Sequence, residues 1–205
     1  RRAADLALRL ARNYPTAANW RDAIRMYREI SNPGVTLTLD AMRLSRAAGA
    51  LQGQADYLTF ARSLHDSALA GEAKAVLDEG VSRGAILATD TAVSQMLGVA
   101  NRRIAEDRTG LDAQIAQARS DPTGRLARVV GDVLYGYGRY GDAADLYRAA
   151  LTKTGEDRNV LNLKLGAALA MAGQRAEAET ALRAVAGSAE GLAQLWLAWL
   201  ATRPA

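Results

Sequence analysis

The chain has no cysteine, one histidine, one phenylalanine and four prolines among its 205 residues. Without cysteine it can form no disulfide framework, no thiolate zinc site and no cysteine nucleophile. The single histidine, His65, argues against a transition-metal site, and any Ser-His-Asp triad would have to use it. Asp66 and Ser67 follow it directly, and adjacent side chains on a helix do not face one another. We therefore expect no catalytic residue, no cofactor and no metal.

Long hydrophobic runs are also missing from the sequence. A bilayer-spanning helix needs about 18 or more consecutive apolar residues, and the most apolar stretch, Leu192 to Ala201, is shorter. The net charge of +4 is mild and gives no basis for expecting nucleic acid as a partner. The sequence begins Arg1-Arg2-Ala3 without methionine, so we expect a piece of a longer chain, and its compartment stays undetermined.

Alanine is the commonest residue and leucine the second, and both favour helices. Runs of β-branched residues are almost absent, which favours an all-α fold. Caps, prolines and glycines predict helix boundaries. The expected helices cover residues 2–13, 19–31, 36–49, 54–68, 72–83, 123–137, 141–153, 158–172, 175–186 and 189–202. Asp121 and Pro122 are expected to begin the helix at 123–137 as its N-cap and first residue.

The segment 90–119 has a helical pattern throughout, but Asp107-Arg108-Thr109-Gly110 is expected to interrupt it. A kink, an odd helix and one long helix are all compatible with this stretch. Counting it as one or two helices gives about 11–12 helices in total. The connections between them are short, so neighbouring helices should be antiparallel.

A repeat is visible in the second half of the chain. Residues Gly138 to Leu151 align with Gly173 to Val185 at an offset of 35 residues, and the alignment pairs Ala143 with Ala178. Seven residues before each turn glycine stands another glycine, Gly131 or Gly166. Ala23 with Tyr27, and more weakly Ala73 with Leu77, repeat the second half of the signal. Small residues at fixed positions let two helices approach closely.

This pattern resembles the tetratricopeptide repeat (TPR), and the whole chain looks similar to bacterial TPR proteins. The resemblance is clear over 124–187 and degenerate over 1–120, and 189–202 would be a C-terminal capping helix. It implies a single domain over 1–205, built as a right-handed superhelical α-solenoid of antiparallel hairpins. It further implies a non-enzymatic scaffold for protein–protein interaction, which binds a peptide or protein on its concave surface.

Carrying the TPR binding positions onto the clearest repeat gives Arg125, Arg128, Asp132 and Tyr135 as partner-binding residues. Some TPRs grip a C-terminal carboxylate with asparagines, but here Asp132 and Lys164 stand at those places. The helix 189–202 adds Trp196 and Trp199, which either pack inward or form a patch for a partner or for self-association. The alternative function is an adaptor or oligomerisation domain of a larger envelope assembly or enzyme.

Other patterns have simpler explanations. The string from Gly136 to Gly141 matches G-x-G-x-x-G, but a helix precedes it where a dinucleotide site needs a strand, so we expect a hairpin turn. The sequence leaves open whether carboxylates from distant helices come together as an acid pair. The arginines around 102–128 could form a basic stripe for an acidic peptide or a phosphate backbone. The acidic residues interspersed with them favour a solvated helix face.

Overall fold

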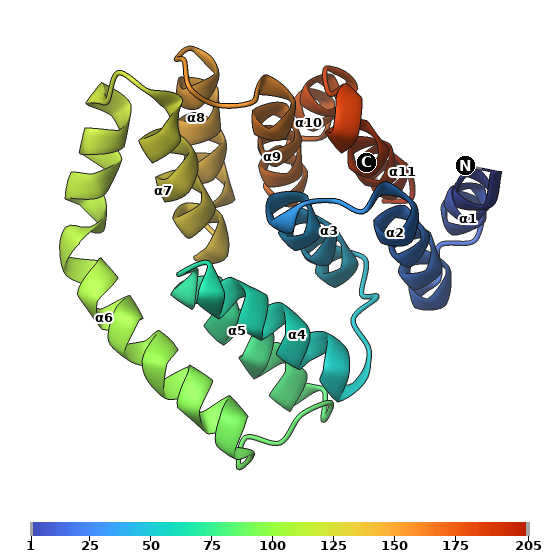
Figure 1. Ribbon diagram of the computed structural model, residues 1–205, viewed down its shortest axis with the longest axis horizontal. Coiled ribbons are helices and arrows are strands. Elements are labelled where there is room, and N and C mark those ends of the chain that lie inside the picture. Colours follow the sequence, from blue (N-terminus) through green and yellow to red (C-terminus); the bar gives the residue numbers. More distant parts are fainter. Residues whose placement is uncertain (1, 204–205) are drawn as a thin grey trace. The chain divides into compact units, whose positions relative to one another are not determined.

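The computed structural model describes residues 2–203, so the first residue and the last two of the expected domain 1–205 lie outside the described part. Over residues 2–203 the chain forms eleven α-helices and one short 3₁₀ helix, mostly packed against their neighbours in sequence (Figure 1). This confirms the all-α class. None of the helices in this range is both long and apolar enough to cross a bilayer.

The helices belong to two compact units, residues 1–51 with 156–205 and residues 52–155. The described helices of the first unit are α1 (Arg2–Asn13), α2 (Ala17–Ser31), α3 (Val35–Ala47), α9 (Arg158–Met171), α10 (Arg175–Arg183), the 3₁₀ helix η1 (Gly187–Ala189) and α11 (Glu190–Ala201). Those of the second unit are α4 (Gly53–Asp66), α5 (Ala70–Ser82), α6 (Thr91–Ser120), α7 (Gly124–Gly136) and α8 (Tyr140–Leu151).

In the first unit, both ends of the chain contribute to one core. The hairpins α1/α2 and α9/α10 each pack internally, and α11 contacts α1, α2 and α3 in addition to α9 and α10 (Figure 1). Gly191 at the start of α11 lies against the ring of Tyr27 in α2. The packing of α11 therefore brings residues near 10 and residues near 195 together.

In the second unit, α6 packs along the hairpins α4/α5 and α7/α8. The hydroxyl of Tyr137 donates a hydrogen bond of 2.7 Å to Asp107 in the middle of α6. Lys153 after α8 donates to the carbonyl oxygens of Ala118 and Arg119, at 2.9 and 3.0 Å. These carbonyls lie in the last turn of α6, where unpaired acceptors and the helix dipole favour a cation.

The expected interruption at residues 107–110 is wrong, because α6 runs unbroken from Thr91 to Ser120. The residues expected to break the helix have other roles in the structure. Asp107 accepts from Tyr137 and pairs with Arg103, and the Thr109 hydroxyl donates to the carbonyl of Glu106. An interior glycine such as Gly110 costs about 1 kcal/mol, which does not by itself end a helix.

The N-cap expected at Asp121 is also wrong. Thr123 is the N-cap of α7, and Asp121 is the C-cap of α6. The Asp121 carboxylate accepts from both the backbone N–H and the hydroxyl of Thr123, at 2.8 and 2.7 Å. These bonds lower the pKa of Asp121. The residue therefore organises the loop between two helices.

Four hairpins share one internal register: α1/α2, α4/α5, α7/α8 and α9/α10. In each, a small residue on the first helix is followed twelve positions later by an alanine on the second, and four positions after that by a large residue. The small residues on the first helices are Ala11, Ala61, Gly131 and Gly166. The alanines on the second helices are Ala23, Ala73, Ala143 and Ala178, and the large residues are Tyr27, Leu77, Tyr147 and Leu182. All twelve residues are buried. The periodic signal therefore extends to the two hairpins where the sequence pattern is weak.

The small residues on the first helices are contact points. A methyl group added at Gly131 would lie 2.7 Å from the ring of Tyr147, and one added at Gly166 would lie 2.5 Å from Cγ of Leu182. Equivalent glycines therefore accommodate equivalent large side chains in the hairpins α7/α8 and α9/α10. The string from Gly136 to Gly141 forms the α7–α8 turn, as expected, with Gly138 at φ +74°.

Candidate functional site

The four binding residues expected from the clearest repeat all lie on α7, but they differ in accessibility. Arg125 is exposed and Arg128 half-buried, whereas Asp132 and Tyr135 are buried. Asp132 accepts a 2.9 Å hydrogen bond from the Tyr147 hydroxyl and pairs with Arg128 at 3.5 Å. Tyr135 packs edge to face on Tyr140, with the ring centroids 5.0 Å apart. Asp132 and Tyr135 thus hold the α7/α8 hairpin together.

The side chains of Trp196 and Trp199 point from α11 into the core of the first unit. Trp196 is fully buried and Trp199 is 6% exposed, and their rings meet edge to face at 5.4 Å. The Arg203 guanidinium stacks over Trp199, 5.2 Å from the ring centroid. The more accessible face of this helix carries other residues, among them Gln194, Leu197 and Ala201.

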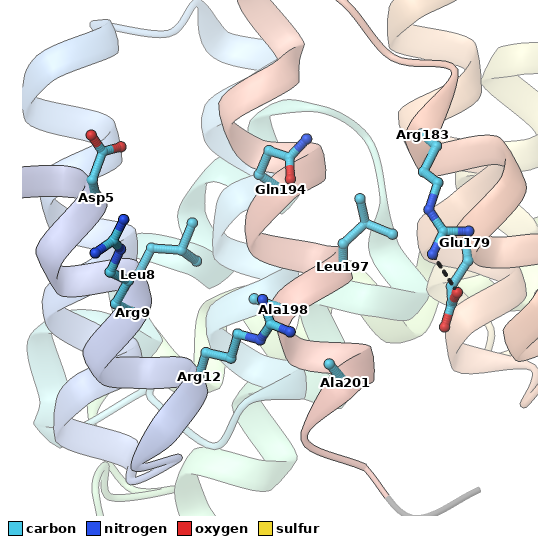
Figure 2. Close-up of a pocket in the computed structure, with 10 residues that line it drawn as sticks. All are labelled: Asp5, Leu8, Arg9, Arg12, Glu179, Arg183, Gln194, Leu197, Ala198 and Ala201. Atoms are coloured by element: carbon cyan, nitrogen blue, oxygen red, sulfur yellow. Dashed lines mark hydrogen bonds and ion pairs between the residues drawn. The ribbon is translucent and has the colours of Figure 1, made fainter.

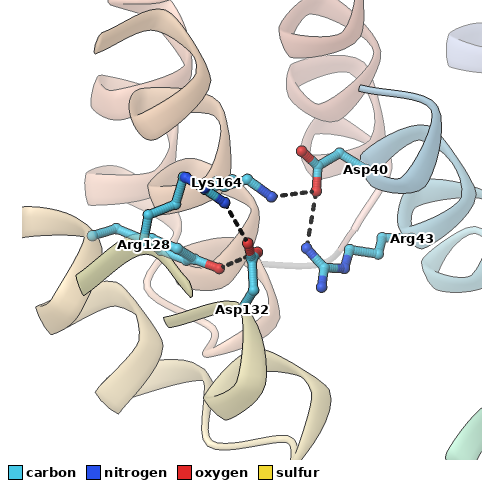
Figure 3. Close-up of polar contacts among 6 residues, drawn as sticks. Asp40, Arg43, Arg128, Asp132 and Lys164 are labelled. Atoms are coloured by element: carbon cyan, nitrogen blue, oxygen red, sulfur yellow. Dashed lines mark hydrogen bonds and ion pairs between the residues drawn. The ribbon is translucent and has the colours of Figure 1, made fainter. Parts of the chain in front are cut away.

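Charged side chains are also buried in the first unit. Asp40 on α3 accepts through Oδ1 from Arg43 at 2.9 Å and from Lys164 on α9 at 3.0 Å (Figure 3). The Tyr27 hydroxyl is buried and has no hydrogen-bond partner among residues 2–203. Burial raises the pKa of Tyr27, and the nearby Asp40 charge raises it further. Lys164, at a position where the carboxylate-gripping TPRs have asparagine, thus serves an ion pair between helices.

A groove in the first unit runs along α11, between α1 and α10 (Figure 2). Its volume is about 420 Å³. Its apolar lining consists of Leu8 from α1 and Leu197, Ala198 and Ala201 from α11. Its polar lining consists of Asp5, Arg9, Arg12, Glu179, Arg183 and Gln194. Helices from opposite ends of the sequence thus form an apolar surface edged by charged groups.

The two sides of this groove differ in how their charges are satisfied. On α10, Glu179 accepts from Arg183 at 2.7 Å and from Arg175 at 3.1 Å. These hydrogen bonds, from Arg175 first and then Arg183, hold the pKa of Glu179 below its ordinary value. On α1, neither Arg9 nor Arg12 pairs with a carboxylate within residues 2–203. Within the part of the chain that the structure describes, the α1 side therefore offers two guanidinium groups without a carboxylate partner.

The lining chemistry suits binding. The apolar residues can bury a partner's side chains, and the guanidinium groups can pair with carboxylates or other anions. A second cavity of about 370 Å³ lies beside Met171, Trp199 and Leu200, with Arg175 and Arg203 at its edge. Within the described part of the chain, no group of three or more His, Cys, Asp or Glu side chains is placed to hold a metal ion.

Sequence reasoning missed the groove along α11. Its α1 side falls in the degenerate part of the repeat, and its other residues lie about 170 positions further along the chain. One signal was available: Gln194 is the only polar residue between Gly191 and Ala201, and it marks the accessible face of α11. That face continues at Leu197, Ala198 and Ala201, with the i, i+3, i+4, i+7 spacing of one helix surface.

No protein-family model, no curated protein and no solved structure gives a significant match to this chain.

Proposed function

We propose that this chain is a non-enzymatic scaffold for protein–protein interaction, built from TPR-like helical hairpins in a right-handed solenoid. The support for the repeat is the register shared by the four hairpins, including the equivalent contacts of Gly131 with Tyr147 and of Gly166 with Leu182. Stacked hairpins provide long preformed surfaces, which bind partners at a low cost in conformational entropy.

One observation carries the binding function: the groove along α11 includes equivalents of three of the four partner-binding positions that the TPR resemblance implies, whereas the equivalent of Tyr135 is Pro15, which is not among the lining residues. In the hairpin α7/α8, the positions are counted from Gly131. Arg125 lies six positions before it, Arg128 three positions before it and Asp132 one position after it. In the first hairpin the same offsets from Ala11 give Asp5, Leu8 and Arg12, and all three line the groove. We therefore propose that the partner binds in this groove.

Affinity capture tests this function with a variant that fills the groove. Ala201 is an exposed lining residue, so Ala201→Trp should occupy the groove without disturbing the core. Ala105→Trp is the matched control, because Ala105 is also exposed on a helix but lies on α6. We expect the wild-type chain and Ala105→Trp to retain a protein partner from the source cells that Ala201→Trp loses. A partner retained equally by all three would contradict binding at this groove.

The adaptor or oligomerisation function remains a second candidate because of an exposed apolar stripe on α1. Leu6 and Tyr14 are 63% and 66% exposed, and Leu10 between them is also exposed. The three side chains follow the i, i+4, i+8 spacing of a helix-packing surface. Light scattering of the wild type and of Leu6→Glu/Leu10→Glu tests this candidate, since only the wild type should form dimers or larger assemblies.

A further inference from the structure

The geometry points to an acidic amphipathic helix of a partner protein as the occupant of the groove along α11. This inference rests on the proposed scaffold function and specifies the chemistry of its partner. Three properties of the groove carry it: the kind of surface it offers, the charge along its edge and its length.

The surface favours a helix over an extended peptide. One way in which an extended peptide gains affinity is through main-chain hydrogen bonds to an exposed strand edge, and these helices offer no such edge. The lining residues belong to helices, whose interior backbone groups are bonded within the helix, and the apolar lining consists of the side chains of Leu8, Leu197, Ala198 and Ala201. A helix satisfies its own backbone and can bury an apolar face on such a floor. The two alanines let its side chains approach α11 closely.

The charge favours an acidic partner. Arg9 and Arg12 lie on the α1 side, and no carboxylate within residues 2–203 pairs with either. Arg183 edges the opposite side and shares Glu179 with Arg175. Asp5 is the one lining carboxylate on α1, and it lies at the other end of that side from Arg12 (Figure 2). We therefore expect the partner helix to carry carboxylates beside its apolar face, where they can form ion pairs with Arg9 and Arg12.

The length of the groove sets the size of the contact. From Asp5 to Arg12 is seven residue steps, or about 10 Å along a helix axis at 1.5 Å per residue. A partner helix would therefore engage the groove over about two turns, with apolar residues at i, i+3, i+4 and i+7. Such a contact is small, so we expect modest affinity and rapid exchange.

Fluorescence anisotropy with synthetic peptides on the full chain tests the inference. The probe is a peptide of about 15 residues with leucine at i, i+3, i+4 and i+7 and glutamate beside them, because shorter helices are marginal in water. Two comparison peptides are used. In one, every glutamate is replaced by lysine; in the other, a single proline replaces a residue in the middle of the acidic sequence. We expect the acidic helix to bind at least about tenfold more tightly than either, and to weaken as ionic strength rises from about 0.05 to 0.5 M.

Protein variants assign the binding to the groove. Arg9→Glu/Arg12→Glu should weaken binding of the acidic peptide at least about tenfold, since it replaces attraction by repulsion. Arg102→Glu/Arg108→Glu changes the net charge equally at exposed sites on α6 and should leave the affinity within about twofold of wild type. Circular dichroism should give the same helix content for all of them, because all four arginines are exposed.

Equal binding of the acidic and lysine peptides, or of the intact and proline-broken peptides, would overturn the inference, as would unchanged affinity in Arg9→Glu/Arg12→Glu. The proposed scaffold function is judged separately, by the cellular partner lost in Ala201→Trp. If that partner is lost while the peptides fail to discriminate, the scaffold function stands and the acidic-helix inference falls.

Discussion

Ala68 has a left-handed backbone conformation, with φ +58°, at the turn between α4 and α5. It lies five positions before Ala73, and the same place in the hairpins α7/α8 and α9/α10 is occupied by Gly138 and Gly173, with φ +74° and +77°. The left-handed conformation costs an L-residue with a Cβ about 1–2 kcal/mol. One turn of the repeat therefore has a strain that the equivalent turns avoid.

We predict that Ala68→Gly raises the free energy of unfolding by about 0.5–1 kcal/mol, because relief of the strain exceeds the extra entropy that glycine loses. Ala68 is exposed, so its methyl group contributes little packing. Gly138→Ala should have the opposite effect and lower stability by about 1 kcal/mol. Urea denaturation followed by circular dichroism measures both changes. Loss of stability in Ala68→Gly would contradict this account of the turn.

The buried Asp40 gives a second prediction for a single residue. Asp40→Asn removes the negative charge that pairs with both Arg43 and Lys164. The two buried cations then lose this counter-charge. We expect a loss of about 3 kcal/mol, which is typical when one partner of a buried ion pair is removed. Asp22→Asn, in the exposed pair with Arg25, should change stability by less than about 1 kcal/mol. Equal effects in the two variants would show that burial does not govern the Asp40 contacts.

Within one hairpin, the effect of a glycine on stability depends on whether it faces a neighbouring helix. Gly131 and Gly141 are both helical glycines in the α7/α8 hairpin, yet only Gly131 faces a neighbouring helix. A methyl group added at Gly141 would have no neighbour within 4 Å, whereas one added at Gly131 would meet the Tyr147 ring. Helix propensity and interhelical contact can therefore be separated by two substitutions in one hairpin.

We predict that Gly131→Ala destabilises the protein by about 1–3 kcal/mol, because Tyr147 must move and its hydrogen bond to Asp132 must adjust. Gly141→Ala should leave stability unchanged or raise it by up to about 1 kcal/mol, since alanine is the better helix former. Thermal unfolding of the two variants beside the wild type measures the difference. A destabilised Gly141→Ala with an unaffected Gly131→Ala would refute the assigned contact.

At the scale of the whole molecule, the two units are connected differently along the chain. Residues 52–155 form one unit as a continuous segment, whereas the other unit needs both 1–51 and 156–205. In that discontinuous unit, the contacts of α11 with α1 and α2 join the two segments. The two units should therefore respond differently when the chain is divided.

We predict that a fragment of residues 52–155 folds alone into α-helices and unfolds cooperatively, because its hairpins and α6 pack within it. The fragments 1–51 and 156–205 should each be largely unfolded alone and should gain helix when mixed, since each lacks half of its core. Circular dichroism of the separate and mixed fragments measures this. Full helicity of either short fragment alone would contradict the shared core.

The sequence by itself determined the all-α class and most helix positions, because alanine and leucine content, caps and turn residues act within a few positions of the chain. It also indicated the repeat register, since small residues such as Gly131 lie against a large side chain of the same hairpin, here Tyr147. It did not determine the continuity of α6. The bond from Tyr137 to Asp107 and the cap by Lys153 come from residues 30 or more positions away.

Only the tertiary structure decided which residues form the groove. Arg12 and Ala201 are almost two hundred positions apart, and no local pattern links them. They line one groove because α11 packs on α1 as well as on α10. The same packing turns Trp196 and Trp199 inward and leaves Leu197 and Ala201 toward the groove, since burying the largest apolar side chains lowers the free energy most.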